Sequence, residues 1–123
     1  GVSYVASAMS SKVKDLANTI VDAMEHPGFS IVHVQSPCTT YNDTYELLKG
    51  SVKKGIEPQA WTIPDNHESS DIKAATELLN RGGIPLGLLY KDTTRPDFQS
   101  RIDSMTKISG SKSTQELLDS LAI

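Results

Sequence analysis

The strongest constraint on the fold is a helical apolar pattern near the start of the chain, which lies between two strand-like runs. Apolar residues from 13 to 24 recur at offsets of 0, 3, 4, 7, 8 and 11, so they share one face of an amphipathic helix. Pro27 ends this pattern, because proline cannot continue the helical hydrogen-bond ladder. Residues 4–6, and residues 29–34 with β-branched Ile31, Val32 and Val34, are typical of strands. A strand, a helix and a strand in one sheet predict a parallel, right-handed crossover.

Helix and strand patterns continue to alternate along the rest of the 123 residues. We expect a short helix over 44–52, a helix from Ile72 closed by Gly82-Gly83, a strand over 84–90, a helix over 98–105, and a C-terminal helix over 113–122 that begins with a capping box. Segment 57–70 contains two prolines and little periodicity, which predicts an irregular excursion. The whole pattern predicts one α/β domain over residues 1–123, with a parallel sheet flanked by helices.

Composition and charge exclude several functional classes. The net charge is −3, and the 12 Lys and Arg residues are scattered, whereas a nucleic-acid interface needs them clustered. No apolar run approaches the roughly 20 residues that span a bilayer, and the first ten residues do not have the pattern of a secretory signal. A single cysteine permits no internal disulfide, which fits a reducing compartment. We therefore expect a cytoplasmic protein that binds neither nucleic acid nor membrane.

Cys38 is the most suggestive residue, because it follows the strand-like run 29–34 at the position where open α/β sheets carry functional loops. Three interpretations compete. A lone cysteine is most often a small buried hydrophobic residue. A catalytic thiolate needs a base, and His33, five residues earlier, would point to the other face of the strand. A metal or cluster ligand needs partners, and an iron–sulfur cluster takes about four thiolates, which this chain lacks. No pattern in the chain predicts a catalytic residue.

Several short motifs, in a fixed order along the chain, resemble those of a known enzyme family. Ser36-Pro37-Cys38-Thr39-Thr40-Tyr41-Asn42 is similar to "S-P-C-x-T-F/Y-N", a fairly specific motif in the late part of β subunits of 2-oxoacid:ferredoxin oxidoreductases. Individually weaker matches are Tyr4-Val5-Ala6, the His26-Pro27-Gly28-Phe29-Ser30 turn, the helix start around Asp65, His67 and Asp71, the Ile84–Tyr90 strand with its "I-P-x-G-x-x-Y" pattern, and Arg95-Pro96. The resemblance covers residues 1 to about 100, while the final helix carries no such match.

The resemblance implies a fold, a reaction and a set of cofactors. It implies the C-terminal portion of a thiamine-diphosphate-binding fold, from an enzyme that oxidatively decarboxylates a 2-oxoacid with coenzyme A to acyl-CoA, carbon dioxide and reduced ferredoxin. Such holoenzymes use thiamine diphosphate, Mg²⁺ and, in many members, a [4Fe–4S] cluster. Cys38 matches the last of the four cluster cysteines, so it is the one cofactor-binding and metal-ligating residue that the resemblance assigns. The implied partners are an α subunit and ferredoxin.

Two features separate this chain from a complete β subunit of that family. The family's diphosphate-binding "G-D-G…N" motif and its early "C-x-x-C" are absent, so we expect the isolated chain to bind no cofactor and to be inactive. Pro27 and Ser7 stand where the family usually has Lys and Arg. The alternative to an oxidoreductase segment is a stand-alone α/β binding or interaction domain with a structural cysteine.

Overall fold

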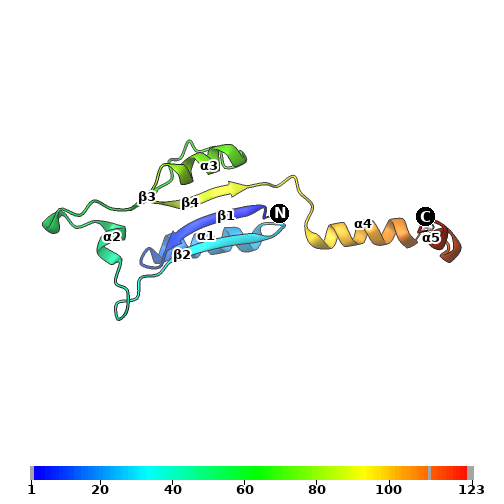
Figure 1. Cartoon of the computed structure of the whole chain (residues 1–123), viewed down its shortest axis with the longest axis horizontal. Helices are drawn as coiled ribbons and strands as arrows, with labels where there is room; N and C mark the ends of the chain where they lie inside the picture. Colours follow the sequence, from blue (N-terminus) through cyan, green and yellow to red (C-terminus); the bar gives the residue numbers. More distant parts are fainter. Residues whose placement is uncertain (1, 111, 122–123) are drawn as a thin grey trace.

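The computed structural model describes residues 2–110 and 112–121, and its body is a four-stranded sheet in the order β2-β1-β4-β3 (Figure 1). The strands are β1 (Tyr4–Met9), β2 (Ser30–Gln35), β3 (Ala60–Thr62) and β4 (Ile84–Lys91). The predicted α/β class and the three predicted strands are confirmed. Segment 57–70, which we expected to be irregular, contains the short strand β3.

The sheet is mixed rather than parallel, which corrects the predicted topology. β1 pairs in parallel with β2, and β3 pairs in parallel with β4, but β1 and β4 are antiparallel. The body therefore consists of two strand–helix–strand units joined through their inner strands. Helical and strand periodicity predicts each unit, because its strands and helix follow one another closely in the sequence. The relative direction of the two units depends on contacts between β1 and β4, which lie far apart in the sequence.

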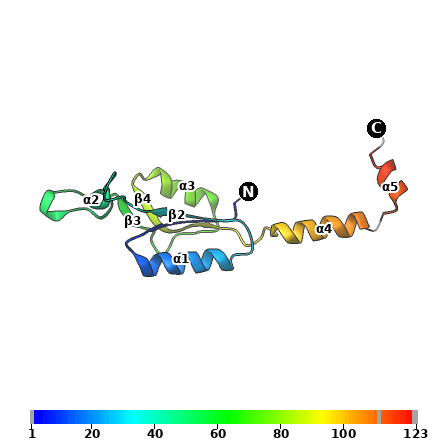
Figure 2. The same cartoon turned by 90° about the horizontal axis from the view of Figure 1, so that it is seen from below.

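The helices lie on both faces of the sheet. Figure 2 shows α1 (Val13–Glu25) below the sheet and α3 (Ile72–Asn80) above it, on the side of β4. The predicted 44–52 helix is shorter than expected: it comprises α2 (Tyr45–Lys49), which is followed by a 3₁₀ turn at Val52–Lys54. α3 begins where Asp71 accepts a hydrogen bond from the Lys73 amide at 2.8 Å. The helix starts at Ile72, as the sequence pattern predicted, and the Asp71 side chain caps it.

Two small groups of buried side chains hold the sheet and helices together. Met9, Leu48 and Leu86 pack at one end of the sheet, and Leu48 comes from α2. Ile63, Leu78 and Leu89 pack beneath α3. The first group matters for the site described below, because it fixes α2 against the sheet and thereby fixes the segment that joins β2 to α2.

The turn between α1 and β2 is closely packed around a buried histidine. The His26 Nε2 atom lies 2.8 Å from the Ser3 hydroxyl, and its ring centroid is 5.5 Å from that of Tyr4. A Cβ atom at Gly28 would lie 2.4 Å from the Ser3 oxygen, so this position has room only for glycine. The Pro-Gly pair therefore does more than end a helix: it lets β2 start against the first residues of β1.

The last two helices form an arm that extends away from the body. α4 (Phe98–Gly110) and α5 (Thr114–Asp119) follow a linker after β4, and neither packs on the sheet (Figures 1 and 2). The predicted 98–105 helix is confirmed and continues to Gly110. The predicted capping box is also confirmed, since the Glu116 amide donates to the Ser113 hydroxyl oxygen and the Ser113 amide donates to the Glu116 carboxylate. Residue 122 of the predicted final helix lies outside the described residues.

Candidate functional site

The candidate site is a tight loop at the carboxyl end of β2. The Cys38 amide donates to the Asn42 carbonyl at 3.2 Å, and the Asn42 amide donates to the Cys38 carbonyl at 2.9 Å. The Asp43 carboxylate accepts from the Tyr45 amide at 3.1 Å, where α2 begins. β2 therefore holds one side of the loop and α2 holds the other.

The Cys38 thiol lies over backbone amides inside this loop. Hydrogen bonds from the amides of Tyr41 and Thr40, and more weakly from that of Asn42, lower the pKa of the thiol, while partial desolvation and the Asp43 carboxylate oppose this. Successive amides that converge on one atom form an anion-binding concavity, which favours the thiolate over the thiol. The thiolate is the form that acts as nucleophile and metal ligand.

The exposure of Cys38 argues against one of its three interpretations, the small buried hydrophobic residue. The side chain is exposed, so it is not a buried hydrophobic residue in this chain. The groups that shift its pKa are backbone amides and Asp43, and no histidine of the described residues is among them. His33 lies instead on β2 and bonds weakly with Gln35. Within the described residues, no histidine contributes to the Cys38 pKa, so the geometry gives no support to a catalytic thiolate.

Cys38 is not part of a multi-residue metal site in the part of the chain that the structure describes. Among residues 2–110 and 112–121, no group of three or more His, Cys, Asp and Glu side chains is placed to hold a metal ion. One accessible thiolate on a rigid amide-lined loop is chemically suited to one corner of a cluster whose other ligands come from elsewhere.

Other residues of the resemblance lie apart from Cys38 and support the fold. His67 Nε2 lies 2.8 Å from the Leu89 carbonyl and ties the segment before α3 to β4. Arg95 Nε lies 2.9 Å from the Asp92 carboxylate, beyond the end of β4. β4 runs antiparallel to β1 and β2, so Arg95 and Cys38 lie at opposite ends of the sheet. The structure does not bring these motif residues into one site.

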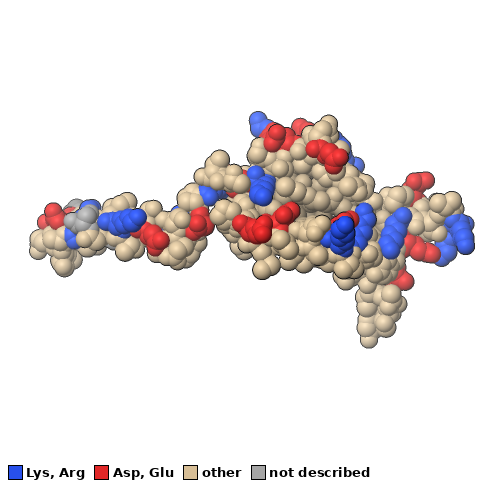
Figure 3. Space-filling model, turned by 180° about the vertical axis from the view of Figure 1, so that it is seen from behind, with Lys and Arg blue, Asp and Glu red and all other residues tan. Residues whose placement is uncertain are grey.

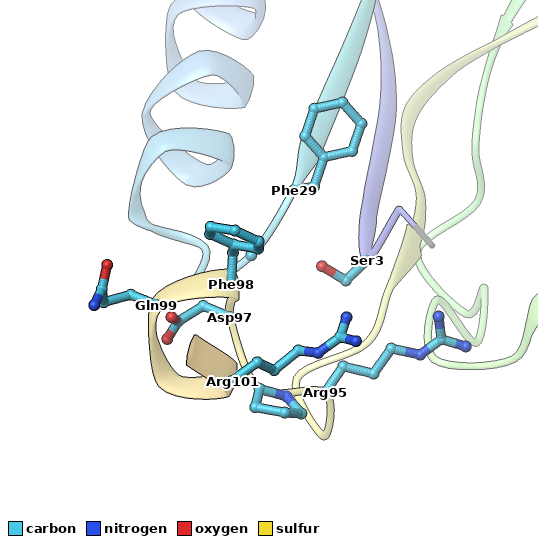
Figure 4. Close-up of a pocket in the computed structure, with 9 residues that line it drawn as sticks. Ser3, Phe29, Arg95, Asp97, Phe98, Gln99 and Arg101 are labelled. Atoms are coloured by element: carbon cyan, nitrogen blue, oxygen red, sulfur yellow. The ribbon is translucent and has the colours of Figure 1, made fainter. Parts of the chain in front are cut away.

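A second feature, which the sequence did not indicate, is an open cleft of about 770 Å³ where the arm leaves the body (Figure 4). Phe29 from the start of β2 and Phe98 from the start of α4 line it together with Arg95 and Arg101. These residues come from distant parts of the chain, and each is unremarkable by itself. Only the fold shows that two exposed aromatic rings and two guanidinium groups share one surface.

The Cys38 loop lies at the start of the region that matches a known family model. Residues 38–107, more than half of the chain, match the model for the C-terminal part of the pyruvate ferredoxin oxidoreductase beta subunit. The chain belongs to this family. Among curated proteins, it is 30% identical over 109 residues to the β subunit of 2-oxoacid:ferredoxin oxidoreductase 1 from Aeropyrum pernix, and the match covers 83% of this chain and 34% of that subunit. It is 29% identical to the corresponding subunit from Saccharolobus solfataricus, over 83% of this chain and 36% of that subunit.

A solved structure is similar over the whole chain. It is a 2-oxoglutarate:ferredoxin oxidoreductase from Magnetococcus marinus with 2-oxoglutarate, coenzyme A and succinyl-CoA bound, with a TM-score of 0.73 and 32% sequence identity. The match covers 100% of this chain and 41% of that one. This member of the pyruvate ferredoxin oxidoreductase β-subunit family spans about a third of the length of its curated relatives. Within the described residues, none of the helices has the length and apolar character needed to cross a membrane.

Proposed function

We propose that this chain is the C-terminal part of the β subunit of a 2-oxoacid:ferredoxin oxidoreductase. The family match over residues 38–107 carries this proposal, and the 32% identity to a 2-oxoglutarate:ferredoxin oxidoreductase over the entire chain supports it. The holoenzyme would oxidatively decarboxylate pyruvate, 2-oxoglutarate or a similar 2-oxoacid with coenzyme A, and would yield acyl-CoA, carbon dioxide and reduced ferredoxin. The isolated chain would be inactive.

Cys38 is the residue of this chain that we assign to the chemistry, as one thiolate ligand of a [4Fe–4S] cluster. The exposed sulfur and the amides of Tyr41 and Thr40 fit this role, since the amides stabilise negative charge on the sulfur before and after it binds iron. When bound, a cluster supplies a one-electron acceptor and donor close to the organic cofactor. The loop between β2 and α2 holds the sulfur in a fixed place at the end of the sheet.

The remaining components would come from outside this chain. Three further thiolates, together with the groups that bind thiamine diphosphate and Mg²⁺, would lie in the rest of the β subunit, because this sequence contains neither the diphosphate motif nor a second cysteine. An α subunit and ferredoxin would be the protein partners. The alternative, a stand-alone interaction domain with a structural cysteine, fits less well because Cys38 is exposed.

The test substitutes Cys38 in the complete oxidoreductase. Cys38→Ser should lower the iron content of the complex and abolish most ferredoxin-linked turnover, because an oxygen ligand replaces a strongly bound thiolate. Thr39→Ala is the matched control in the same loop, since it changes only a side chain and leaves Cys38 and the backbone amides that donate to its sulfur in place. Full iron content and normal turnover in the Cys38→Ser complex would refute the ligand assignment.

A further inference from the structure

The face of the sheet on which α3 lies is covered only in part. α3 packs on β4, whereas α1 packs on β1 and β2 from the opposite side of the sheet, as Figure 2 shows. This arrangement leaves much of the α3-side face of β1 and β2 uncovered, and an open groove of about 370 Å³ lies there beside α3. Pockets for small molecules in proteins have volumes of roughly 300–1,000 Å³. The groove is therefore large enough for a small ligand.

Small residues explain why the sheet is hollow at this point. Ser7 pairs with His33 on β2 and with Gly87 on β4, and residues paired in register share one face of a sheet. A Cβ atom at Gly87 would lie 3.6 Å from Ile63, which packs beneath α3, so the row of three residues faces α3. Gly87 has no side chain and Ser7 has only a hydroxymethyl group. The space between α3 and β2 is therefore left unfilled.

The walls of the groove are apolar and uncharged. The apolar residues that line it come from α3, β1 and β4 and include Val5, Ile72, Ala75, Leu79, Ile84 and Leu89. None of the described residues that line it is Lys, Arg, Asp or Glu. Figure 3 shows the molecule from behind, where acidic and basic side chains are instead mixed over the body. A charged ligand would lose hydration in the groove without gaining an opposite charge, so the groove fits an uncharged molecule.

A buried hydroxyl group without a hydrogen bond lies in the floor of the groove. Ser7 is 5% exposed, and its Oγ atom has no hydrogen-bond partner within the described residues. Buried polar groups in proteins are nearly always hydrogen-bonded, so an exception needs an explanation. His33 and Gln35, on the β2 side of the groove, bond only weakly to each other at 3.4 Å. A ligand oxygen placed over Ser7 would supply the bond that the hydroxyl group lacks.

We propose that this groove is a binding site for a small, uncharged, mainly apolar molecule that carries one hydroxyl or carbonyl oxygen. The apolar part of the ligand would lie along α3 against Ala75 and Leu79, and its oxygen would bond to Ser7 Oγ. Ser7 makes room for the ligand, because the arginine that the family usually has at this position would occupy the groove with a long, charged side chain. The proposal does not depend on the proposed enzymatic function.

The experiment titrates the full 123-residue chain with benzyl alcohol, a probe of this chemical class, and follows the backbone amides by two-dimensional NMR. We expect saturable binding, with the largest shifts at Ser7, His33 and Ala75. Toluene has the same ring but no hydroxyl group, so the two probes together isolate the hydrogen bond. Ser7→Ala should weaken binding of benzyl alcohol roughly tenfold, because it leaves the hydroxyl group of the probe unpaired, and should leave the toluene affinity unchanged.

Two variants that close the groove test where the probes bind. Ser7→Arg fills the floor, and Thr76→Trp places a large ring at the rim, so each should abolish binding of both probes. Thr76 is exposed on α3, so the second variant should fold even if the first does not. Ser104→Ala removes an exposed hydroxyl group from α4 and is the control that should leave both affinities unchanged.

Three results would overturn the proposal. The first is that neither probe binds saturably up to its solubility limit. The second is that Ser7→Ala keeps the full affinity for benzyl alcohol, which would show that the hydroxyl group does not contact the ligand. The third is that the amide signals of Ser7, His33 and Ala75 move with protein concentration alone, which would make the groove a contact between copies of the chain.

Discussion

The body and the arm of this chain are stabilised in different ways. The body buries Tyr4 and Met9 almost completely between its sheet and helices. α4 and α5 instead rely on local interactions, such as the Ser113–Glu116 capping box and the Gln99–Asp103 hydrogen bond of 2.8 Å. Local capping is worth about 1 kcal/mol, whereas a buried core side chain contributes more through packing. The body is therefore held together by buried side chains, whereas local interactions stabilise the helices of the arm.

The sharpest test of this contrast is the same substitution in both regions. Met9 is 2% exposed in the core and Met105 is 64% exposed on α4. Met9→Ala should lower the free energy of unfolding by about 2–5 kcal/mol, because it leaves a cavity beside Leu48 and Leu86. Met105→Ala should change it by less than about 0.5 kcal/mol in dilute solution. Urea unfolding followed by Trp61 fluorescence measures both, and equal losses would mean that the arm belongs to the same cooperative unit.

Alanine substitutions at two separate glycines should change stability less, and they test the packing at the start of β2. Gly28→Ala should cost about 1–3 kcal/mol, because the new methyl group meets the Ser3 hydroxyl and disturbs its bond to His26. Gly110→Ala is the control, since open space surrounds that position at the end of α4 and alanine favours helix. Calorimetric melting temperatures compare the two variants. A Gly28→Ala protein as stable as the Gly110→Ala protein would show that this turn is loosely packed.

The smallest expected effect is a shift in the pH at which Cys38 ionises. It tests whether the Cys38 loop is folded as part of the body. The amides of Tyr41 and Thr40 lower the pKa of Cys38 only while the loop is folded. Alkylation by iodoacetamide, which requires the thiolate, should therefore reach its half-maximal rate at a lower pH in the native chain than in urea. Asp43→Asn should shift the native midpoint lower still, because the Asp43 charge opposes ionisation. Identical midpoints in the native and unfolded chains would contradict the loop geometry.

Sequence patterns predicted the local elements well and the long-range arrangement poorly. The periodicity of residues 13–24, the Asp71 helix start and the Ser113 capping box depend on neighbours within a few residues, and the structure confirms them. The antiparallel contact between β1 and β4 depends on distant residues, so the predicted parallel sheet was wrong in that respect. The ligand role that we propose for Cys38 rests on its loop motif only through the resemblance. The arm-base cleft had no signal in the sequence, because its aromatic and arginine residues meet only in the fold.

The central position of β1 has a consequence for the order in which the chain folds. Tyr4 pairs with Ser30 on one side and with Lys91 on the other. The first partner is available soon after β1 leaves the ribosome, but the second must wait until β4 has been made. Contacts between distant residues also carry a larger loop-closure cost, which slows folding. A nascent β1-α1-β2 unit therefore spends part of synthesis with one edge of its inner strand unpaired, where binding by a chaperone would protect it.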